Sequence, residues 1–214
     1  MPDGGPQEGG PGNEPHQDGN NASKVTYSGY KEFTEDGSES DRTYVSPASD
    51  ESVVLVKTRG GRGTLINPTV KKSGDTSSAD NSSFYGQNAV LLAADGTSGI
   101  KGGSAVSDAE GGAGAAGISS GAINISGIKI ITGGNAAGDI HAASGGTLHA
   151  WNLEVTTSGE HSAAIRSDRG GGTLTAEGGS CVSNGRGSPA VYSTADIDIK
   201  DAALISDGPE AACI

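Results

Sequence analysis

The sequence predicts an all-β fold, a parallel β-helix, and three observations support this prediction. Residues 146–195 contain two copies of one pattern, GTLHAWNLEVTTSGEHSAAIRSDRGG and GTLTAEGGSCVSNGRGSPAVYSTA. Apolar and polar residues alternate in short segments such as INIS at 123–126, which is the pattern of a strand. No segment shows the 3.6-residue apolar repeat of a capped helix, so essentially no helix is expected. A repeat of about 25 residues with short strands and glycine turns is typical of a solenoid, whereas an antiparallel sandwich predicts closely spaced hairpins.

Seven coils can be assigned in order, each with about three short strands. Glycines are expected at the corners, because sharp turns need positive φ values. The first two coils are longer than the others, and the longest polar insertion, Asp75–Phe84, is a candidate binding loop. The coils are expected at residues 24–61, 64–96, 97–120, 121–145, 146–195 (two coils) and from 196 onward.

Three columns of inward-facing residues can be aligned between coils, with members 22 to 27 residues apart in the regular part of the chain. The first column is expected to contain Leu65, Ile123, Leu148, Leu174 and Ile197. The second lies seven residues later and contains Ile130, Val155, Cys181 and Leu204, with Lys72 as an exception. The third contains Leu55, Leu91, Ile118, Ile140, Ile165, Val191 and Cys213. Cys181 and Cys213 are therefore expected to be buried free thiols.

The domain organisation is expected to be a disordered leader at residues 1–23 and a β-helix domain at 24–214. The leader is rich in Gly and Pro and has almost no apolar residue to bury. It lacks the basic and apolar regions of a secretory signal, and the last residues, EAACI, are expected to be an interrupted strand of a longer chain. An open apolar end at Ile214 would favour end-to-end self-association.

The charge and the residue types exclude several function classes. A formal net charge of −12 disfavours binding to nucleic acid and to anionic membrane surfaces. No apolar run is long enough to span a membrane. The two cysteines and four histidines lack the spacing of a zinc site, and Asp75, Asp108 and Asp207 do not form the oxygen cluster that calcium needs. No cofactor and no metal is expected.

Residues 64–214 resemble a group of bacterial, gut-associated, adhesin-like proteins. The resemblance rests on NPTVKKSGDTSSADNSSFYGQNAVLLA, EHSAAIRSDRGGGTL and GSPAVYSTADIDI. It implies a right-handed parallel β-helix in a secreted or surface-anchored protein, with a leader rich in Gly and Pro. It implies no established reaction, and no signal peptide is present in this chain.

The best candidate binding site is a column one residue beyond the third column. Leu92, Ser119, His141, Arg166 and Tyr192 occupy these positions and are expected to face outward. Adjacent His141, Arg166 and Tyr192 would suit a carbohydrate, because Tyr can stack on a sugar ring and Arg can donate to hydroxyl or carboxylate groups. An ordinary solvated face is the alternative.

Two further features are candidate sites. The turn Arg166–Gly172 contains Asp168 and Arg169, which either grip a sugar acid or form a corner salt bridge. Trp151, the only tryptophan, has polar neighbours in register at Ser126 and Glu177, so it is expected to face outward as a sugar platform or to pack over a corner. A Ser/Thr column at Thr132, Thr156–Thr157, Ser183 and Ser206 is expected to be a hydrogen-bonded stack that fixes the register of the coils.

The leading hypothesis is a non-enzymatic, extracellular or cell-surface β-helix, adhesin-like, that binds glycan or a host or matrix protein. The alternative is a polysaccharide lyase or glycoside hydrolase acting on an acidic polysaccharide, with Arg166, Asp168 and Arg169 as the first residues to test. Glycosidase chemistry needs two carboxylates about 5–9.5 Å apart, for which neighbouring coils offer Asp139 and Asp168. A stalk without a binding site is the third hypothesis.

Overall fold

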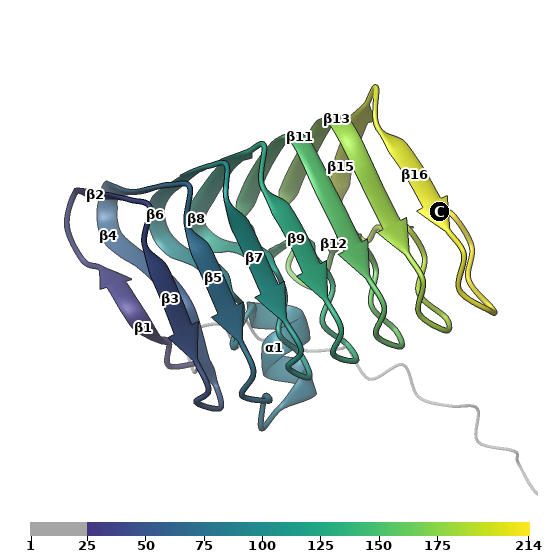
Figure 1. Ribbon diagram of the computed structural model, residues 1–214, viewed down its shortest axis with the longest axis horizontal. Helices are drawn as coiled ribbons and strands as arrows, with labels where there is room; N and C mark the ends of the chain where they lie inside the picture. The colour runs from purple at the N-terminus through teal and green to yellow at the C-terminus, as the bar shows by residue number, and fades with distance from the viewer. Residues whose placement is uncertain (1–24) are drawn as a thin grey trace, which may run out of the picture.

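The computed structural model describes residues 25–214 and shows a parallel β-helix of about seven coils. The coils stack along the long axis of the molecule, from β1 at one end to β16 at the other (Figure 1). All strand pairings are parallel, and each joins one coil to the next. The predicted fold class is therefore confirmed, while the expected leader at residues 1–23 lies outside the described residues.

Each coil contributes strands to three faces. Face 1 contains β1 (Ser28–Phe33), the first parts of β4 (Glu51–Ile66), β6 (Leu91–Lys101) and β8 (Ala115–Ser126), and then β10 (Ile140–Ala143), β12 (Ile165–Ser167) and β14 (Val191–Tyr192). Face 2 contains β2 (Gly37–Ser40), the second parts of β4, β6 and β8, the first parts of β11 (Thr147–Thr157) and β13 (Thr173–Ser183), and β15 (Asp196–Lys200). Face 3 contains β3 (Thr43–Ser46), β5 (Thr69–Lys72), β7 (Ser104–Ser107), β9 (Lys129–Thr132), the second parts of β11 and β13, and β16 (Ala203–Ser206).

In every coil, the corner between faces 2 and 3 begins with a left-handed residue. Gly adopts this conformation at low cost because it has no Cβ to meet the following carbonyl, and Asn and Asp tolerate it because their short polar side chains hydrogen-bond locally. The chain meets this requirement at Asp41, Asn67, Gly102, Gly127, Asn152, Gly178 and Asp201, all with φ between 49° and 67°. These seven positions therefore mark the length of each coil in the sequence.

The first and second columns hold in the regular coils and need one correction near the start. Leu148 pairs with Ile123 and Leu174, as predicted. Leu65 does not belong with them, because it pairs with Ile100, and the first-column position in that coil is Gly63. The same shift of two residues puts Val70, and not Lys72, in the second column.

The third column needs three corrections. In the third coil the column position is Ala115, which pairs with Leu91 on one side and with Ile140 on the other. The column then continues through Ile165 and Val191. Ile118 therefore lies three residues beyond the column. Val54, and not Leu55, pairs with Leu91. Cys213 lies one residue before the column. The Val191 amide donates to the Cys213 carbonyl at 3.0 Å, just as the Ile165 amide donates to Ala190, the residue before its register partner Val191, so Ile214 is the residue in register. The Cys213 thiol is exposed, contrary to the prediction, whereas Cys181 is buried and its pKa is raised to about 12 by burial.

The predicted Ser/Thr stack exists and is buried inside face 3. Its members Thr132 and Thr157 have no exposed surface, and the Thr132 hydroxyl donates to the Thr157 hydroxyl at 3.0 Å. Lys72 occupies the same column as these residues. Its ammonium group donates to the carbonyls of Ala48 at 2.5 Å and Gly74 at 2.6 Å, which satisfies a buried charge with backbone dipoles.

One short helix contradicts the expectation that the chain has essentially none. Helix α1 (Ala79–Tyr85) lies within the insertion that was expected to be a loop. The Ser78 hydroxyl caps its start by accepting from the Asn81 amide, and Gly86 ends it with a φ of 65°. Seven residues are too few to show a helical apolar repeat, so only these capping residues marked the helix in the sequence. No helix among residues 25–214 is long and apolar enough to cross a membrane.

The two ends of the coil stack differ in polarity. In the first coil, Lys31, Glu39 and Tyr44 occupy inward positions, and the Glu39 carboxylate accepts from both the Lys31 ammonium and the Tyr44 hydroxyl. Inward charges of this kind block the pairing of further strands. At the other end, Ile197 and Leu204 pack on the core but stay half-buried.

Candidate functional site

The predicted column on face 1 is in register. His141 of β10 pairs with Arg166 of β12, and Arg166 pairs with Tyr192 of β14. Ser119 does not belong to the column, because the residue that pairs with His141 on the other side is Ala116. The exposed fraction is 46% for Tyr192, but only 1% for His141 and 9% for Arg166. The expectation that all three face solvent is therefore right for Tyr192 alone.

The insertion that contains α1 covers the other members of this column. Outward residues of the earlier coils, among them Leu55, Leu92 and Ala116, form a second apolar cluster outside face 1. Gly86, directly after α1, lies so close to this cluster that a Cβ on it would be 3.1 Å from the Ala116 Cβ. Face 1 is thus buried on both sides in these coils, and the unbroken apolar run VLLAA at 90–94 was the signal for it in the sequence.

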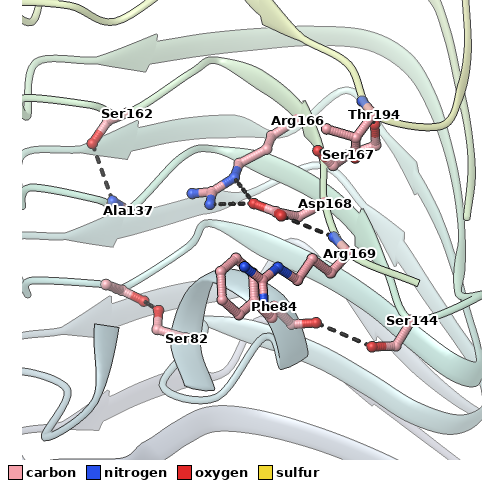
Figure 2. Close-up of polar contacts among 11 residues, drawn as sticks. Ser82, Phe84, Ala137, Ser144, Ser162, Arg166, Ser167, Asp168, Arg169 and Thr194 are labelled. Atoms are coloured by element: carbon pink, nitrogen blue, oxygen red, sulfur yellow. Dashed lines mark hydrogen bonds and ion pairs between the residues drawn. The ribbon is translucent and has the colours of Figure 1, made fainter. Parts of the chain in front are cut away.

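Side-chain hydrogen bonds fix the insertion to the coils. The Ser144 hydroxyl donates to the Phe84 carbonyl at 3.1 Å, and the Ser82 hydroxyl donates to the carbonyl of Gly111 (Figure 2). Earlier in the insertion, the Asp50 carboxylate accepts from the Ser77 amide at 2.8 Å. These contacts hold Phe84 beside the turn that follows β12.

A groove of about 540 Å³ lies between α1 and the last coils of face 1. It includes four of the six residues selected from the sequence as binding residues, Arg166, Asp168, Arg169 and Tyr192. Its lining is Ser83, Phe84, His161, Ala163, Arg166, Asp168, Arg169, Gly187, Pro189, Tyr192 and Thr194. Phe84 comes from the insertion that was expected to be a binding loop, whereas His161 was not suggested as a site residue from the sequence.

The charged groups of the groove are organised around Asp168. The Arg166 Nε donates to Asp168 Oδ2 at 3.0 Å, and Arg166 Nη2 contacts the same oxygen (Figure 2). The other oxygen accepts from the Arg169 amide at 2.8 Å. The predicted corner salt bridge therefore exists. Because it is mostly buried, removing one partner would cost about 3–5 kcal/mol, far more than for a surface pair.

Arg169 is available to a ligand. It is exposed, and its guanidinium carbon lies 4.2 Å from the centre of the Phe84 ring. Stacking on the ring orients the guanidinium plane while its N–H groups stay accessible, which is the geometry that arginine uses to bind carboxylates.

His141 and Asp139 are buried groups behind the groove. Neither ring nitrogen of His141 has a hydrogen-bond partner among residues 25–214, and burial, followed by the nearby charge of Arg166, lowers its pKa to about 3. Asp139 is fully buried, and burial raises its pKa well above the usual value. Asp168 is bound to Arg166, so Asp139 and Asp168 do not form the pair of accessible carboxylates considered from the sequence.

Trp151 faces outward, as predicted, but not into the groove. It lies on face 2, in register with Ser126 and Glu177, with 39% of its surface exposed. The six predicted residues therefore fall into three environments: four in the groove, His141 buried behind it, and Trp151 on another face.

The acidic residues considered for calcium have structural roles where contacts are defined. The Asp75 carboxylate accepts from the Glu110 amide at 2.9 Å. Within the part of the chain that the structure describes, no three His, Cys, Asp or Glu side chains are grouped so that they could hold a metal ion.

No model of a known protein family, no curated protein and no solved structure matches this chain. The chemistry of the groove therefore follows from its own residues.

Proposed function

We propose that this chain is a non-enzymatic, adhesin-like surface module that binds a glycan carrying carboxylate groups in the groove beside α1. The observation that carries the proposal is the convergence of an exposed tyrosine, Tyr192, and an exposed arginine, Arg169, on one open groove. An aromatic ring beside oriented hydrogen-bond donors is a recurrent way to bind a sugar ring.

Charge favours an acidic ligand. The protein has a net charge of −12, yet the groove contains two guanidinium groups and a single carboxylate. That carboxylate, Asp168, is bound to Arg166. Arg169 is thus left to bind an anion, and its position over the Phe84 ring limits the entropy lost when it does so.

A hydrolase mechanism has less support from the groove. Glycosidases need one carboxyl group as acid and a second as base or nucleophile. Among the described residues that line the groove, Asp168 is the one carboxylate. Binding without cleavage is therefore the function that these residues support best, and a host or matrix protein remains the alternative partner.

A glycan array, with the purified chain run beside an assay for new reducing ends or unsaturated sugars, tests this proposal. We expect binding to acidic glycans and no product. With Trp151 replaced by Ala, so that the aromatic surface of face 2 does not contribute, we expect a loss of at least tenfold in affinity for Tyr192→Ala and for Arg169→Ala, about 1.4 kcal/mol each. Tyr30→Ala removes a tyrosine that is 60% exposed in the first coil and serves as the matched control. Product formation would overturn the non-enzymatic assignment, and unchanged binding in both variants would overturn the site.

An extracellular or cell-surface location is part of this proposal. It is supported by the resemblance of residues 64–214 to adhesin-like β-helix proteins. Detection of the full-length native protein by surface proteolysis of intact cells tests it, and complete protection from the protease would contradict it.

A further inference from the structure

Face 2 has a second hollow that the proposed groove does not use. Its volume is about 570 Å³, and it lies around Trp151 on a different face from α1. It is lined by Arg62, Thr64, Gly99, Ile100, Lys101, Asn124, Ser126 and Trp151. These residues come from four successive coils, so the hollow runs along the axis of the solenoid.

Trp151 forms a fixed platform at one end of this hollow. Its ring lies 6.0 Å from the ring of His149, the preceding outward residue of β11, at an angle of 32°. His149 is itself held by Thr175 of the next coil, through a contact of 2.7 Å between His149 Nδ1 and the Thr175 hydroxyl. Because the His149 ring already restricts the Trp151 side chain, Trp151 loses little further conformational entropy when a ligand binds to it.

A missing side chain creates the depth of the hollow. Thr64, Gly99 and Asn124 occupy one outward column of face 2 in successive coils. Gly99 has no side chain, and a Cβ on it would be 3.4 Å from an Arg62 guanidinium nitrogen. Arg62 therefore lies over Gly99 at the far end of the hollow from Trp151.

The charges on the hollow are positive and unpaired within residues 25–214. Arg62 and Lys101 are both exposed, and neither forms an ion pair there. Lys200, two coils beyond Trp151, is 3.8 Å from Glu177 and so is already paired. Two cations in a hollow that also contains a tryptophan and an asparagine, in a chain of net charge −12, favour an anionic ligand.

We propose that this hollow binds an anionic glycan strand running along the coil axis. Trp151 stacks on one sugar ring, Asn124 and Ser126 hydrogen-bond hydroxyl groups, and Lys101 and Arg62 bind acidic groups further along the strand. Coils stack at about 4.8 Å, which is close to the length of one sugar unit, so successive coils meet successive sugars. A hollow that runs along the axis over four coils suits an extended strand, and the proposal does not depend on the groove of face 1.

The fluorescence of Trp151 reports on this site directly, because it is the only tryptophan in the chain. The full chain is titrated with oligogalacturonate, with the fully methyl-esterified oligomer, with dextran sulfate and with polyglutamate. We expect oligogalacturonate to change the emission saturably and to protect Trp151 from acrylamide quenching. The Arg62→Ala/Lys101→Ala double variant should weaken this binding three- to tenfold, and Lys200→Ala, the control on the same face, should not change it.

Each outcome decides the proposal. Saturable changes with oligogalacturonate or dextran sulfate, and not with the ester, support an anionic glycan and tell carboxylate from sulfate recognition. Equal changes with the ester would refute charge recognition, and equal changes with polyglutamate would refute glycan recognition. An unchanged emission with every probe would refute the site. Arg169→Ala should leave the emission change intact, so failure of the groove and failure of this hollow are distinguishable.

Discussion

Replacement of Asp139 by Asn tests the energetics of the buried carboxyl group. Asp139 has no exposed surface, and neither of its carboxyl oxygens has a hydrogen-bond partner in the described chain. Its pKa in the folded protein is raised by burial. Above about pH 4 the unfolded chain releases this proton while the folded protein keeps it, so stability falls as the pH rises until the folded pKa is passed.

His141 titrates with the opposite sign. Its folded pKa of about 3 lies below the usual histidine value of 6.5. Between these two values the unfolded chain binds a proton that the folded protein does not, so stability falls as the pH is lowered. Each group changes the free energy of unfolding by about 1.4 kcal/mol per pH unit, and between roughly pH 4 and 6.5 the two changes oppose each other.

Asp139→Asn keeps the shape of the protonated carboxyl group and removes its titration. Relative to the original chain, the variant should therefore gain about 1.4 kcal/mol of stability per pH unit from roughly pH 4.5 upward, until the folded pKa of Asp139 is reached. Urea unfolding followed by circular dichroism at several pH values measures this difference. Asp198→Asn, a substitution of the same type at an exposed position on face 2, serves as the matched control. A pH-independent difference for Asp139→Asn would refute the argument.

Three further predictions concern the coils. Lys72→Ala should destabilise the fold by about 2–4 kcal/mol in urea unfolding, because the carbonyls of Ala48 and Gly74 lose a charged donor, whereas the more exposed Lys71→Ala should be nearly neutral. Gly127→Val should cost at least about 1–2 kcal/mol and Gly127→Asn less, since φ is 61° there and only the backbone conformation, with no neighbouring atom within 4 Å, opposes a side chain. We also propose end-to-end association through the apolar end at Ile197, seen as a concentration-dependent mass in light scattering; a constant monomer mass would contradict it.

The regular coils were predictable because their repeats align without gaps. Leu148 and Leu174 lie at equal positions in two similar copies, and they pair in the structure. The earlier coil was misaligned because Thr64–Leu65 resembles Thr147–Leu148. The left-handed corner residues Asn67 and Asn152 would have corrected this, since the corner comes two residues after Leu65 and four after Leu148.

The location of the site was predictable in part. The alternation on face 1 placed Arg166 beside Tyr192, because register follows from the repeat. The burial of His141 was not predictable from the repeat, because it depends on an insertion from a distant coil. Phe84 reaches the groove through contacts with Ser144 and Arg169, which no local sequence pattern encodes.

The central claim is that the groove beside α1 binds an acidic glycan through Tyr192 and Arg169. The most direct test is calorimetric titration of the full chain with oligogalacturonate, in the Trp151→Ala background so that the hollow of face 2 does not contribute. We predict one binding site that is weakened at least tenfold by Tyr192→Ala and unaffected by Tyr30→Ala. The claim would be contradicted if the Trp151→Ala chain bound oligogalacturonate with the same affinity alone, with Tyr192→Ala and with Tyr30→Ala. It would also be contradicted if the Trp151→Ala chain did not bind at all.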